Sequence, residues 1–262
     1  MVADVLSGVF EKMNSFTSFC DDLYLDMHIN TELDLPSERD TILTFFERIQ
    51  RQFPAMGNFA RKDTGEFCLE EERDGERFRW VTLELDRIGS TCANPTNLKD
   101  AYELHALVLE LAPYMLGVSH LDMTSLDVTF TMDFDFQGNH DEVVADALFG
   151  STAFTSLLDL PLATPIGFSP NVIVALTEDC RTQARIAVEP RTSVYEIRHD
   201  KYKGDEAISL YFTIRRYPDP HGKFDALASF HRQCQIAEEI MAERIIPYFA
   251  KPLINAIAQR RK

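Results

Sequence analysis

The chain has 262 residues, of which 45% are hydrophobic and 26% are charged, and its formal net charge is −16. This composition is typical of a globular protein, and we expect no membrane-spanning helix, because no run of about 18 apolar residues occurs. We expect no secretory signal, because the N-terminus carries acids early and shows no basic region followed by an apolar one. The negative charge argues against nucleic-acid binding, because a phosphate backbone would be repelled.

The first predicted elements are a strand and a helix. Segment 23–30 has apolar side chains at every second position, and this period of two is typical of a β-strand. A helix is predicted over 37–53, where apolar residues recur at helical spacing until Pro54 ends the pattern. Ser37 and Asp40 have the spacing of a capping box at its start.

A hairpin is predicted next, from extended runs at 67–73 and 77–88. The runs are joined around Asp74 and Gly75, and this residue pair favours a tight turn because both central residues of such a turn need positive φ. Residues 89–95 are predicted to form a loop.

The strongest strand signal is at 126–136, where six apolar side chains alternate with aspartates and threonines. One face of this strand must be covered by apolar partners, while the other face is polar and acidic. Helices are predicted before and after it, with Asn97 and Asn139 as their N-caps.

The last part of the sequence predicts more strands and a long helix. A short helix and then a loop are expected within 151–165. The final helix begins near Leu227 and should be kinked or divided by Pro247 and Pro252. Three strands are predicted before it, at 171–177, 183–199 and 207–217.

The element order is β-α-β-β-α and then β-α-β-β-β-α. Because hairpins dominate, we expect an α+β fold with a mainly antiparallel sheet of about seven strands and helices packed on one face. The order predicts one globular domain, 1–262, built as a degenerate tandem with pseudo-repeats at roughly 20–118 and 121–258. Two smaller sheets lying side by side are the alternative.

The polar face of the sheet is the first candidate site. Asp133, Asp135 and Glu84 are candidates for acid–base catalysis, because neighbouring carboxylates can shift each other's pKa. Asp127, Asp133 and Asp135 are candidate ligands for a hard cation. Otherwise a solvated acidic face explains the pattern, and we expect no metal and no cofactor.

The later strands supply a second candidate site. Tyr211, Arg215 and Tyr217 alternate along one predicted strand, and Arg198 lies on its predicted neighbour. Aromatic side chains together with arginine can bind a small anion or a planar ligand. Intramolecular ion pairing explains the same residues without any ligand.

No catalytic spacing occurs in the sequence, so the leading hypothesis is a non-catalytic binding or assembly protein, expected to be a homodimer. The acidic face suits a cationic or basic partner, because 26 Asp and Glu but only 11 Lys and Arg lie in residues 1–138. One alternative is a hydrolase or lyase that holds a small molecule in a sheet–helix cleft. Another is a peptide-binding adaptor that uses an open sheet edge.

The cysteines bear on the compartment. There are five of them, widely spaced and without a C-x-x-C pair. We therefore expect reduced thiols in a cytoplasmic protein.

Overall fold

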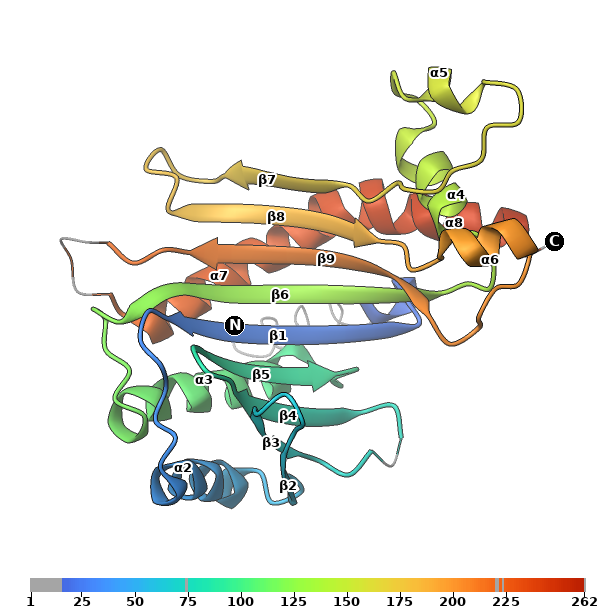
Figure 1. The fold of residues 1–262 in the computed structure, drawn as a ribbon. Coiled ribbons are helices and arrows are strands. Elements are labelled where there is room, and N and C mark those ends of the chain that lie inside the picture. The colour runs from blue at the N-terminus through green and yellow to red at the C-terminus, as the bar shows by residue number, and fades with distance from the viewer. Residues whose placement is uncertain (1–15, 74, 220–221, 223, 262) are drawn as a thin grey trace, which may run out of the picture.

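The fold is seen in a computed structural model that describes all residues except 1–15, 74, 220–221, 223 and 262 (Figure 1). Asp74 of the predicted hairpin turn therefore lies outside the described residues. No helix within the described part of the chain is long and apolar enough to cross a membrane.

One large antiparallel sheet runs through the protein, in the order β2-β3-β4-β5-β1-β6-β9-β8-β7. Every neighbouring pair of strands is antiparallel. The fold is thus α+β with an antiparallel sheet, as predicted. Its strands are β1 (Asp22–Thr31), β2 (Asn58–Arg61), β3 (Phe67–Glu70), β4 (Phe78–Leu83), β5 (Arg87–Ala93), β6 (Met123–Asp135), β7 (Asn171–Ala175), β8 (Thr182–Glu189) and β9 (Ala207–Arg216).

The sheet has nine strands among the described residues, where the sequence predicted about seven. One reason is that the predicted run 77–88 is divided by a tight turn, where the Glu84 N–H donates to the Arg87 carbonyl at 2.9 Å. The chain after that turn is β5. Residues 89–95 were wrongly predicted to form a loop, because they are mostly small and polar. The other missed strand is β2, which is only four residues long, each of them exposed.

The helices follow the predicted order closely. Asn97 and Asn139 are N-caps as predicted, and each side chain accepts a backbone N–H of its helix. The helical segments are η1 (Thr17–Phe19), α2 (Arg39–Gln52), α3 (Leu98–Met115), α4 (His140–Val144), η2 (Ala145–Phe149), α5 (Thr155–Leu158), α6 (Val194–His199), α7 (Ala226–Ile240), η3 (Met241–Ala250) and α8 (Lys251–Arg260).

Two local predictions are wrong. The capping box of Ser37 and Asp40 does not form, because α2 starts one residue later, after Glu38, without any side-chain cap. The strand predicted over 183–199 ends at Glu189, and its last six residues form α6. A capping box between Ser193 and Glu196 starts α6, and this local signal overrides the extended pattern.

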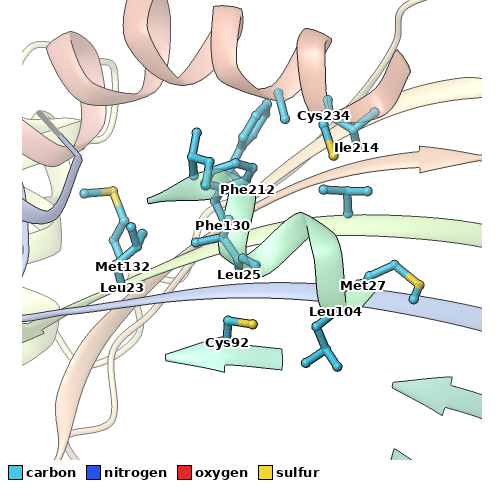
Figure 2. Close-up of a cluster of buried hydrophobic side chains, with 14 of the residues drawn as sticks. Leu23, Leu25, Met27, Cys92, Leu104, Phe130, Met132, Phe212, Ile214 and Cys234 are labelled. Atoms are coloured by element: carbon cyan, nitrogen blue, oxygen red, sulfur yellow. The ribbon is translucent and has the colours of Figure 1, made fainter. Parts of the chain in front are cut away.

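The core lies on the apolar face of the sheet. Leu25 of β1, Phe130 of β6 and Phe212 of β9 stand beside one another in register, each at most 2% exposed. Figure 2 shows these side chains beneath α7, with Cys234 of α7 close to Ile214. The other sheet face, opposite α3 and α7, carries the polar residues that the sequence predicted.

Candidate functional site

The polar face of the sheet forms a shallow hollow of about 440 Å³. Its lining residues come from six neighbouring strands, from β5 to β7 in the sheet order. The lining includes Asp26, His28, Asp127, Ile173, Arg185, Tyr211 and Arg215. Two of the candidate ligand-binding residues, Tyr211 and Arg215, therefore share one surface with Asp127, a candidate cation ligand.

Asp127 and Arg215 form a bidentate ion pair. Arg215 Nε lies 2.7 Å from Asp127 Oδ1, and its Nη2 lies 2.5 Å from Oδ2. The hydrogen bond to Asp127 raises the pKa of Arg215 above its usual value. Asn30 adds a third hydrogen bond to this carboxylate at 3.3 Å. The two charges therefore neutralise each other within the chain, which weakens the attraction of either for a ligand ion.

Asp133 and Tyr211 belong to a second polar network. Ser209 donates to Asp133 at 2.6 Å, and Arg191 donates to both the Ser209 hydroxyl and the Tyr211 hydroxyl at 2.9 and 3.0 Å. Burial raises the pKa of Asp133 and of Tyr211. Asp133 lies outside the lining of the hollow, so it does not face the same space as Arg215.

The other predicted site residues are dispersed. Asp135 is exposed at the end of β6, where burial and the nearby Asp21 and Asp22 raise its pKa. Glu84 sits in the β4–β5 turn in an ion pair with Arg87 at 2.6 Å. Tyr217 follows β9, with the Arg215 guanidinium 6.0 Å from its ring centre. Arg198 is exposed on α6, not on a neighbouring strand.

Asp26 is the group that sequence reasoning undervalued. It lies in the middle of β1, where it accepts hydrogen bonds from Thr91 at 2.7 Å and from Thr131 at 3.3 Å. Burial raises its pKa, and the nearby His28 partly opposes this effect. Its strand position was predicted, but the two threonines come from strands whose neighbours the sequence did not reveal.

Metal binding gains no support from this geometry. No group of three or more His, Cys, Asp or Glu side chains that could hold a metal ion occurs among the described residues. Asp133 and Asp135 are neighbours on one face of β6, whereas Asp127 lies three same-face positions before Asp133, and each has its own surroundings.

The free edge of the sheet at β7 is the second candidate site. In the antiparallel pair with β8, the Leu176 N–H donates to the Thr182 carbonyl at 2.7 Å, and the Val188 N–H donates to the Pro170 carbonyl at 3.0 Å. Because paired positions alternate along an antiparallel strand, the even-numbered residues of β7 bond to β8. The backbone groups of Asn171, Ile173 and Ala175 therefore point away from the sheet, and no further strand of the described chain lies beyond them.

This edge is unusually apolar. All five residues of β7 are exposed, and Ile173 is 58% exposed between two exposed valines. The preceding segment 150–170, which carries α5, adds exposed apolar side chains, of which Leu162 is fully exposed. Within 150–177 the only charged residue is Asp159. Edge strands are normally protected by charges or proline, and β7 has neither within its five residues.

A sequence signal for this surface exists but is indirect. The stretch N-V-I-V-A reads equally well as a buried strand, because a continuous apolar run is typical of strands covered on both faces. Only the strand order places it at the edge.

No protein-family model matches this sequence, and a search of curated proteins found no match to it. The geometry described above is therefore the basis for the function proposed next.

Proposed function

We propose that this chain is a non-catalytic binding protein that joins its partner by strand addition at β7. An extended segment would add a tenth strand to the sheet beside Asn171, Ile173 and Ala175. The observation that carries this proposal is the open edge itself, with outward backbone groups and exposed apolar side chains on both faces. Main-chain hydrogen bonds then supply affinity, and the alternating side chains supply selectivity.

Several observations favour this surface over the polar face. The acidic carboxylates there were expected to suit a cationic or basic partner, or to act in a hydrolase or lyase. Asp127 is paired with Arg215, Asp133 is bonded to Ser209, and Asp26 is bonded to two threonines. Groups that are already satisfied inside the chain gain little from a ligand.

The sharpest test of strand addition is Ile173→Pro. The Ile173 N–H faces outward, so proline removes one edge donor without removing any hydrogen bond to β8. Short random peptides displayed on phage would be selected on the wild-type protein and then scored on the variant. We expect peptides enriched on the wild type to lose binding to Ile173→Pro by at least about tenfold, since lost main-chain pairing and ring clash act together.

Ile173→Thr is the matched control, because threonine keeps both the N–H and the β-branched shape of isoleucine. The selected peptides should bind this variant within a few-fold of the wild type. Equal binding to the wild type and to Ile173→Pro would refute strand addition at this edge.

We propose further that the chain is one domain assembled from two halves of one plan. In support, the central strands β1 and β6 stand side by side, and each pairs with the last strand of its own half, β5 or β9. The helices α3 and α7 each follow those last strands. One core cluster contains buried residues from both halves.

A further inference from the structure

We propose that the strand added at β7 is the β7 strand of a second copy of this chain, paired antiparallel about a twofold axis at Ile173. This inference rests on the strand addition proposed above and names its partner. It predicts one sheet that continues from one copy into the other.

The outward backbone groups have the symmetry that such a pairing needs. A twofold axis at Ile173 places Asn171 of each copy opposite Ala175 of the other, and Ile173 opposite itself. All three positions have their N–H and C=O groups directed outward. Two copies can therefore exchange about six main-chain hydrogen bonds without moving β7 from β8.

Charge favours a second copy over a basic protein. The chain carries a net charge of −16, so two copies repel each other over most of their surfaces. The stretch 150–177 holds the single charged residue Asp159, which makes this edge a place where like-charged copies can meet. A basic partner would find only Asp159 as a complementary charge in the same stretch.

The strand alone is too small an interface. Five extended residues span only about 17 Å. One strand of this length covers much less area than the about 800 Å² that a stable interface buries on each partner. In Figure 1 the segment that carries α5 rises beyond the β7 edge, near the end where β7 begins. We name this segment, residues 150–166, the arm. Its exposed apolar side chains are Phe154, Leu157, Leu160, Leu162 and Ile166.

The arm is positioned to supply the missing area. In an antiparallel pair, the start of one β7 lies beside the end of the other. Each arm would then extend past its own edge over the partner's Ala175 and Leu176, where Leu176 is 37% exposed. Apolar side chains of the arm that face solvent in one copy would become buried in the dimer.

Disulfide trapping of two variants tests this register directly. In the proposed pairing, Val172 of one copy faces Val174 of the other at a position without main-chain hydrogen bonds, with a Cα separation of about 4.5 Å. This separation suits a disulfide. Val172→Cys and Val174→Cys would be made in a Cys180→Ser background, because Cys180 is an exposed thiol.

We expect oxidation of an equimolar mixture of the two variants to give a covalent dimer. Each variant alone should give little, because its two cysteines would lie about two residues out of register, beyond the reach of a disulfide. Sedimentation of the full wild-type chain should give the mass of two chains, and Ile173→Pro should shift it to one chain, whereas Ile173→Thr should not.

Two results would overturn the proposed pairing of two copies about Ile173. One is a wild-type monomer up to high micromolar concentration with no covalent dimer in the mixture. The other is a covalent dimer from either variant alone, which requires a different register. If the wild type is monomeric while phage-selected peptides still distinguish Ile173→Pro from Ile173→Thr, strand addition stands and only its self-pairing fails. If the dimer survives Ile173→Pro, the two copies do not pair through β7 and the self-pairing proposal fails, while the peptide comparison alone decides strand addition.

Discussion

At the level of single residues, His105 of α3 is a titratable side chain buried in the core. It is 1% exposed, and its Nδ1 lies 2.7 Å from the hydroxyl of Ser90, itself fully buried on β5. Its Nε2 has no hydrogen-bond partner in the described part of the protein. Burial lowers the pKa of His105 to about 3, so this imidazole is neutral in the folded protein at neutral pH.

The free energy of unfolding should therefore depend on His105 under mildly acidic conditions. In the unfolded chain the imidazole binds a proton below about pH 6.5, whereas in the folded protein it does so only near pH 3. Above pH 6.5, His105 is neutral in both states and does not lower the free energy of unfolding. As the pH falls below 6.5, the free energy of unfolding decreases by about 1.4 kcal/mol per pH unit. His105→Gln should show a correspondingly shallower loss of stability between pH 6 and pH 4 in urea titrations.

A second buried histidine does not affect the comparison between the wild type and His105→Gln. His140, whose pKa burial also lowers, is present in both proteins, so its effect cancels in the difference. At pH 7 the variant should lose about 1–3 kcal/mol, because the buried Ser90 hydroxyl loses a partner. If the free energy of unfolding falls equally with pH in the two proteins, His105 binds its proton in the folded protein as easily as in the unfolded chain, and the prediction is wrong.

At the level of elements, α7 is attached to the sheet by one buried side chain. Gln233 is 2% exposed, and its Nε2 donates to the carbonyls of Leu126 on β6 and Ile214 on β9, both at 2.8 Å. This amide bridges the strand pair directly beneath the helix.

Replacing Gln233 by leucine should destabilise the protein by about 1–3 kcal/mol, because two buried carbonyls lose their donor. Urea unfolding at pH 7 measures this change. Arg232→Leu is the matched control on the adjacent, exposed position and should change stability by less than about 0.5 kcal/mol. A loss in Gln233→Leu no larger than in the control would show that packing alone fixes α7.

The elements also show how far local sequence reasoning reaches. Segment 126–136 was predictable, because its alternation is long and both its partners bury the same face. The strand β5 was not, because Gly89, Ser90 and Thr91 have weak strand propensity, and their conformation is fixed by pairing with β1 and β4. The capping box that starts α6 is present in the sequence, but the strand-like run before it led us to extend the predicted strand through it.

At the level of the whole molecule, the two halves depend on each other through β1 and β6. These strands pair over ten residues of β1, from Asp22 to Thr31, in the middle of the sheet. Separating the halves would turn two buried central strands into open edges and uncover part of the shared core.

We therefore expect the fragments 1–118 and 119–262 to lack a cooperative unfolding transition when each is expressed alone. Mixed or co-expressed, they should reassemble and unfold in one transition, because the β1–β6 pairing is restored. Calorimetry of each fragment and of the mixture tests this. A cooperative transition in an isolated fragment would indicate two independent domains instead of one.

The candidate polar site shows the same division between local and tertiary information. The sequence placed Tyr211 and Arg215 on one strand face and Asp127 on another. It could not show that Asp127 and Arg215 pair with each other, because they are 88 residues apart and meet only through β6–β9 pairing. The grouping of Arg198 with these residues rested on a strand that is α6 in the structure.

The sequence by itself determined the alternation of strands and helices, the antiparallel character of the sheet and the separation of an apolar from an acidic face. These properties depend on side-chain period and on turn and cap residues, which are local. The strand order was decided only by the tertiary structure, because pairing joins residues that are distant in the chain. That order leaves the uncharged strand β7 at an open edge and surrounds most acidic candidates with partners from neighbouring strands.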